Sequence, residues 1–84
     1  MVYYLITCRS LTYAQKAARA LERAGITASI MRTPKGLSRE GCSYCVKVSE
    51  RRASLALNVL RETDTRISRV FTQYPTGEIR EVSI

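Results

Sequence analysis

The stretch Val2-Tyr3-Tyr4-Leu5-Ile6-Thr7 opens the chain with a short run of β-branched and aromatic residues. Such a run is typical of a mostly buried strand. A few residues later the apolar positions recur at i, i+3, i+4 and i+7, which is the spacing of one helix face. These positions are Ala14, Ala17, Ala18 and Leu21. The beginning of the chain therefore predicts a strand followed directly by a helix.

Local signals mark both ends of this helix. Ser10 or Thr12 can cap its start, and Thr12 with Gln15 forms a candidate capping box. Gly25 is placed to end the helix in the left-handed conformation, which glycine adopts without a steric cost. Apolar and polar residues then alternate from Ile26 to about Arg32, so we predict that a second strand follows the helix at once.

The second half of the chain repeats this order. Residues 33–41 contain Pro34 and two glycines and form a predicted loop, and alternation over 44–48 predicts a third strand. Ser49 can cap a second helix, whose apolar face is Ala53, Ala56, Leu57 and Leu60. We predict a fourth strand over 67–74, a turn at 75–77 and a short edge strand over 78–84.

The resulting order, βαββαβ with one extra strand, predicts an α+β fold. We expect a ferredoxin-like two-layer sandwich over residues 1–84 as a single domain, with an antiparallel sheet and both helices on one face. In that arrangement the first and third strands lie side by side and run in opposite directions. Cys8, the start of the first helix, the 33–41 loop and Cys42 should then meet at one edge of the sheet.

Composition limits the function. A chain of 84 residues buries only about 60% of its unfolded surface, so a deep catalytic cleft is not expected. The net charge of +7 attracts anions, but the basic residues are spread from Arg9 to Arg80 and form no tail. Binding of bases on a ferredoxin-like sheet needs aromatic side chains along its central strands, and the third strand offers only Tyr44. A nucleic-acid partner is therefore not favoured.

The cysteine count and the hydropathy pattern indicate a compartment. Three cysteines do not make a secreted disulfide framework, and no segment reads as a cleavable signal. No apolar run approaches the roughly 18 residues of a membrane span. We expect a cytoplasmic protein with reduced thiols and no membrane contact.

The spacing of Cys42 and Cys45 matches several known motifs poorly. A thioredoxin-type pair begins a helix, whereas this pair leads into a predicted strand. Structural zinc and iron–sulfur sites need four ligands, and the chain has three cysteines and no histidine. We expect neither a metal nor another cofactor, although a metal shared across a dimer stays open. Free cysteine is also often buried as a small hydrophobe, an explanation that suits Cys8 best, competes at Cys45 and suits Cys42 least.

A thiol at the predicted edge would have favourable electrostatics for nucleophilic chemistry. The exposed N–H groups at a helix start near Ser10 and the side chains of Arg9, Lys35 and Arg39 would favour a thiolate. Such a sulfur can accept and pass on a sulfur or selenium atom, since persulfide transfer needs an accessible, activated thiol.

Several segments resemble a known family of small bacterial proteins, the selenium/sulfur carrier-like proteins, over nearly residues 2–62. They are Leu5-Ile6-Thr7, Arg9-Ser10, Ala24-Gly25-Ile26, Thr33-Pro34-Lys35-Gly36-Leu37-Ser38 and Gly41-Cys42-Ser43-Tyr44-Cys45-Val46-Lys47-Val48. The resemblance implies that Cys42 is the carrier thiol, preceded by a loop with Pro34, Leu37 and Ser38. The chain departs from the family pattern in a loop one residue longer, in Ser43 where the family has glycine, and in the added Cys45.

The resemblance implies a carrier or accessory protein and not an enzyme. Cys42 would hold the transferable atom as a persulfide or selenosulfide. Cys45, which the family pattern does not require, would either act as a resolving thiol or simply fill space. The expected partner is a sulfur or selenium donor enzyme such as a cysteine desulfurase. The alternatives are a non-catalytic regulatory or nucleic-acid-binding module that uses its basic surface, and a homodimer formed through strand edges without chemistry.

Overall fold

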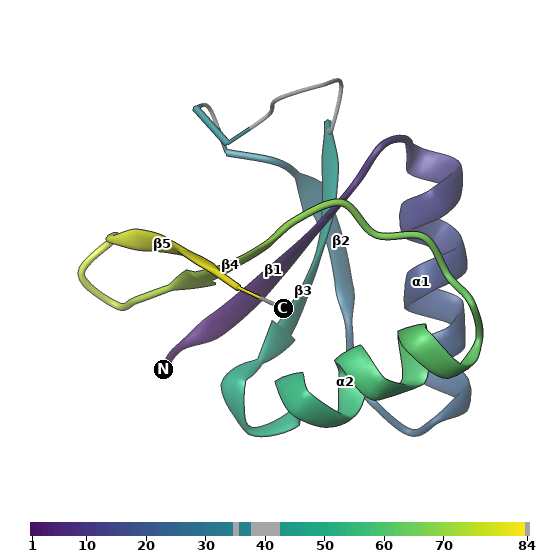
Figure 1. Cartoon of the computed structure of the whole chain (residues 1–84). Helices are drawn as coiled ribbons and strands as arrows, with labels where there is room; N and C mark the ends of the chain where they lie inside the picture. The colour runs from purple at the N-terminus through teal and green to yellow at the C-terminus, as the bar shows by residue number, and fades with distance from the viewer. Residues whose placement is uncertain (35, 38–42, 84) are drawn as a thin grey trace.

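A computed structural model describes residues 1–34, 36–37 and 43–83 of the chain (Figure 1). In this part of the chain an antiparallel sheet of five strands has the order β2-β3-β1-β4-β5, and both helices cover one of its faces. The elements are β1 Tyr3–Cys8, α1 Leu11–Arg23, β2 Ser29–Arg32, β3 Tyr44–Ser49, α2 Glu50–Glu62, β4 Val70–Gln73 and β5 Ile79–Val82. The predicted α+β, ferredoxin-like arrangement is confirmed, including the extra C-terminal strand beside β4.

The predicted caps are found at both ends of α1, but the predicted side-chain cap of α2 is not formed. The Ser10 hydroxyl accepts a hydrogen bond from the Tyr13 N–H at 3.3 Å and caps α1. Thr12 lies inside the helix, so the predicted capping box at Thr12 is wrong. At the other end Gly25 has φ +79°, and the N–H of Ile26 bonds the Leu21 carbonyl at 2.9 Å, which is a Schellman cap. Ser49 precedes α2 but makes no side-chain capping bond.

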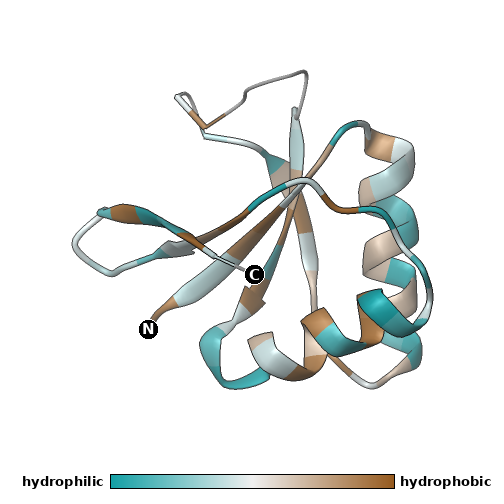
Figure 2. Ribbon diagram, in the orientation of Figure 1, coloured by the Kyte–Doolittle hydropathy of each residue, from teal (hydrophilic) through white to brown (hydrophobic). Residues whose placement is uncertain are grey.

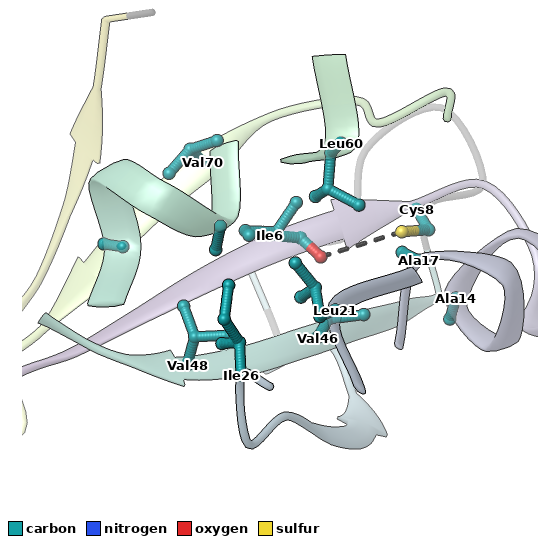
Figure 3. Close-up of a cluster of buried hydrophobic side chains, with 12 residues drawn as sticks. Ile6, Cys8, Ala14, Ala17, Leu21, Ile26, Val46, Val48, Leu60 and Val70 are labelled. Atoms are coloured by element: carbon teal, nitrogen blue, oxygen red, sulfur yellow. Dashed lines mark hydrogen bonds between the residues drawn. The ribbon is translucent and has the colours of Figure 1, made fainter. Parts of the chain in front are cut away.

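The larger apolar core lies between the helices and the sheet (Figure 3). The predicted faces of both helices are buried, except that Leu57 is only half-buried, and all of their residues but Ala18 belong to or pack against this core. From the strands, the core receives Ile6, Val46, Val48 and Val70. Figure 2 shows hydrophobic residues along the central strands and an alternation of hydrophobic and hydrophilic residues along both helices. This packing fixes α1 and α2 against the central strands β1 and β3.

A second, smaller cluster lies on the face of the sheet that no helix covers. Leu5, Cys45 and Phe71 are buried in it, and Met31, Leu37 and Ile79 pack around them. Lys47 and Arg69 place their charged groups over the rings of Tyr3 and Phe71 at 4.1 and 5.3 Å. Long side chains thus shield this face without a third layer.

Two strands are shorter than the alternation predicts. β2 begins at Ser29, because Ile26 is buried as part of the cap that ends α1. β4 begins at Val70, because Ser68 and Arg69 both lie opposite Thr7. The N–H of Ser68 bonds the Thr7 carbonyl, and the Arg69 carbonyl accepts from the Thr7 N–H, both at 2.8 Å. This two-against-one pairing is typical of a β-bulge.

Candidate functional site

The end of β1, the start of α1 and both ends of the 33–43 connection lie at one edge of the sheet (Figure 1). Cys8 is the register partner of Tyr44, so the last residue of β1 lies beside the first residue of β3. The N–H of Thr33 bonds the Ser43 carbonyl at 2.9 Å and closes the base of the connection. The positions of Lys35, Ser38, Arg39 and Cys42 lie outside the described residues.

Cys8 belongs to the core. Its side chain is fully buried on the helix-covered face, and its Sγ lies 3.8 Å from the Ile6 carbonyl oxygen (Figure 3). Ala14 and Ala17 of α1 lie beside it in the same cluster. The explanation favoured from sequence, a cysteine that packs as a small hydrophobe, is confirmed for Cys8.

Cys45 is also fully buried, on the opposite face of the sheet. Burial raises the pKa of its thiol, and this rise is only partly offset by the nearby Thr33 hydroxyl and by the charge of Lys47. The Thr33 oxygen lies close to the thiol without the geometry of a hydrogen bond, and it has no hydrogen-bond partner among the described residues. Cys45 therefore has the surroundings of an unreactive thiol, because a buried, protonated sulfur is a poor nucleophile.

The loop that precedes Cys42 is anchored by Leu37. The N–H of Leu37 bonds the Pro34 carbonyl at 3.1 Å, and Gly36 in between has φ +91°, a conformation that favours glycine. The half-buried Leu37 side chain packs on the cluster of Leu5, Cys45 and Phe71. Leu37 thus ties the start of the loop to the helix-free face, a packing role that the sequence alone did not reveal, and Pro34 accepts the hydrogen bond that closes the turn before it.

Two of the four predicted anion-stabilising residues, Arg9 and Ser10, lie in the described part of the chain, and only Arg9 is exposed. The Ser10 hydroxyl is engaged in capping α1. Arg9 is exposed and lines a hollow of about 310 Å³ together with Tyr13, Arg66, Ile67 and Ser68. Arg66 was not identified from sequence, since it stands far from Arg9 along the chain and no local motif marks it.

Two further findings concern metals and membranes. Within residues 1–34, 36–37 and 43–83, no group of three or more histidine, cysteine, aspartate or glutamate side chains is arranged to hold a metal ion. None of the helices in the same residues combines the length and the apolar character needed to cross a bilayer.

Comparison with known proteins identifies the family. Residues 3–72 match the family described as "putative Se/S carrier protein-like". No curated protein and no solved structure matches the chain. The match runs from the start of β1 into β4 and includes the position of Cys42. The chain therefore belongs to the family of Se/S carrier-like proteins.

Proposed function

We propose that this protein is a carrier that holds a sulfur or selenium atom on Cys42 and passes it to an acceptor. The observation that carries the proposal is the location of the other two thiols. Cys8 and Cys45 are both buried, on opposite faces of the sheet. Cys42 directly precedes the exposed Ser43 in the chain and lies within the residues matched by the carrier-like family. We therefore assign the transferable atom to Cys42 alone and not to a Cys42–Cys45 pair.

The proposed chemistry is an exchange at sulfur. The Cys42 thiolate attacks the outer sulfur of a persulfide on a donor protein, a new S–S bond forms on Cys42, and the donor cysteine leaves as a thiolate. In delivery, a cysteine thiolate of the acceptor attacks the outer sulfur, a new S–S bond forms on the acceptor, and Cys42 leaves as a thiolate. The transferred sulfur keeps its oxidation state in both steps, so no external oxidant or reductant is needed. A selenium atom would follow the same route through a selenosulfide.

The surroundings of the loop support this role. The exposed Arg9 stands at the edge where the connection joins the sheet, and Lys35 and Arg39 precede Cys42 in the chain. Positive charge near a thiol favours the thiolate. We further propose that the protein acts in the cytoplasm as a non-catalytic carrier and receives the atom from a donor enzyme such as a cysteine desulfurase.

Mass spectrometry of loaded protein tests the proposal. The protein is incubated with a cysteine desulfurase and cysteine, trapped with an alkylating reagent and digested with chymotrypsin, which cleaves after Tyr44 and so separates the Cys42 and Cys45 peptides. We expect the mass of one added sulfur atom on the Cys42 peptide. Loading should be abolished by Cys42→Ser and retained in Cys8→Ala and Cys45→Ala.

Two results would contradict the proposal. One is added sulfur on Cys8 or Cys45 while the Cys42 peptide stays unmodified, and the other is equal loading of the protein and of Cys42→Ser. Repetition with a donor loaded with selenium would compare the two elements directly.

A further inference from the structure

Two adjoining hollows are lined by residues of α1 and of the segment between α2 and β4. This segment runs beside α1 (Figure 1). The first, of about 310 Å³, begins at Arg9, and the second, of about 510 Å³, extends to Arg23. Tyr13 and Arg66 line both. We call the two hollows together the basic groove, after the cations that line it: Arg9, Lys16, Arg19, Arg23 and Arg66.

Charge is concentrated in the basic groove. Five of the 14 basic residues of the chain line it, but only one of the seven acidic residues, Asp64. Elsewhere, Arg69 and Arg80 are paired with Glu81 and Glu78. Within the described residues, none of the five groove cations forms an ion pair. Among the described residues, the groove is therefore a place where positive charge is gathered and available to a partner.

The spacing of these cations suits a chain of phosphates. Lys16, Arg19 and Arg23 follow one another at intervals of three and four residues, so they lie on one side of α1, and each step rises roughly 4.5–6 Å along the helix axis. Four of the five groove cations are arginines. The planar guanidinium can donate two parallel hydrogen bonds to a phosphate, which a lysine cannot do.

Tyr13 adds a feature that simple attraction between charges does not require. It occupies α1 between Arg9 and Lys16, and its side chain is 37% exposed although it is a large aromatic residue. An exposed ring that is flanked by cations is the usual platform on which an unpaired base stacks, while the neighbouring cations hold the backbone. An acidic protein surface would be attracted by the cations but would gain little from this ring.

From these observations we propose that the basic groove binds a single-stranded nucleic acid, with its phosphates on the groove cations and a base stacked on Tyr13. The sheet has too few exposed aromatic residues for this role, so the sequence-based argument against a nucleic-acid partner addressed a different surface. The groove begins at Arg9, at the edge where the connection that contains Cys42 joins the sheet. The inference does not depend on the proposed thiol chemistry, and Cys42→Ser should bind as tightly as the unchanged protein.

Fluorescence anisotropy over a series of salt concentrations tests the proposal. The labelled probes are oligouridylate, the DNA strand of the same length with thymine bases, and an RNA duplex. The groove variant is Arg19→Gln with Arg23→Gln. The control is Arg51→Gln with Arg52→Gln, which removes the same charge from exposed positions of α2 outside the groove. The affinity falls with salt, and each lost phosphate contact should make the slope of log affinity against log salt less steep by about 0.7. For two contacts this corresponds to roughly 25-fold weaker binding at about 0.1 M salt.

The groove variant should show this loss and the control a much smaller one, with both single strands bound more tightly than the duplex. Tyr13→Ala should weaken binding of the single strand by at least about fivefold, leave the salt slope unchanged and leave the affinity for inorganic polyphosphate unchanged. Circular dichroism confirms that each variant is folded.

Three outcomes would overturn the proposal. Equal losses in the groove and control variants would show that only net charge matters. If Tyr13→Ala binds the oligonucleotide with unchanged affinity, stacking of a base on Tyr13 is excluded. Competition by polyglutamate as strong as that by the oligonucleotide would identify the groove as a docking surface for an acidic protein.

Discussion

Replacement of Thr7 by valine tests how the groove wall is held in place. The Thr7 hydroxyl is buried in the central strand β1, accepts a hydrogen bond from the Arg69 N–H at 2.9 Å and donates one to the Arg69 carbonyl at 3.1 Å. These bonds join residues that are 62 positions apart and fix the bulge that leads into β4. Thr7→Val keeps the shape of the side chain but removes both bonds.

The size of the effect follows from the bonds lost. Each hydrogen bond contributes about 0.5–1.5 kcal/mol, so Thr7→Val should lower the free energy of unfolding by about 1–3 kcal/mol. For a domain of this size the melting temperature should fall by roughly 5–15 °C. Thr72 provides the matched control, because it is buried in β4 and its hydroxyl makes a single, longer bond of 3.3 Å to the Arg80 carbonyl. Thr72→Val should cost less than about 1 kcal/mol.

Urea denaturation followed by circular dichroism measures both variants under identical conditions. The added methyl group is the same in each, so the difference between them reports the two bonds to Arg69. Thr7→Val as stable as Thr72→Val would refute the reasoning and would mean that the bulge is held by the backbone alone.

The remaining predictions concern the helix-free face. Leu37→Ala should lower the free energy of unfolding by about 1–2 kcal/mol, because half-buried packing is lost, whereas Leu55→Ala on the exposed side of α2 should change it by less than about 0.5 kcal/mol in urea denaturation. Equal effects would exclude the anchoring role of Leu37. The raised pKa of Cys45 means that the unfolded chain loses its thiol proton at lower pH than the folded protein. Stability that is fully present below the ordinary thiol pKa of about 9.0 should therefore fall above it, by up to about 1.4 kcal/mol per pH unit, and this fall should be smaller in Cys45→Val.

Local sequence predicted the elements well where the deciding interactions are local. Ser10 and Gly25 bound α1 because capping and the left-handed terminator involve residues within one turn. The apolar spacing of α1 predicted its buried face for the same reason. Thr12, the other candidate cap, stands only two residues after Ser10, and which of the two is used depends on where β1 ends.

The limits of the prediction appear at Cys45 and at the start of β4. The sequence left both a buried and a functional role open for Cys45, yet it is fully buried, because Leu5 and Phe71 from other strands and Leu37 from the connection cover it. The bulge at Ser68 and Arg69 depends on Thr7, a residue that no local pattern connects to them. Burial of a sheet face that lacks a helix is set by side chains that come together only on folding.

The sequence by itself therefore determined the order of elements, the ferredoxin-like class and the choice of Cys42 as the thiol to test, because periodicity, capping and motifs are properties of neighbouring residues. Only the tertiary structure decided that Cys8 and Cys45 are core thiols and that Arg66 joins the cations of α1 in one groove. Burial and the summed field of charges both depend on distances between segments far apart in the chain, and those distances exist only in the folded protein.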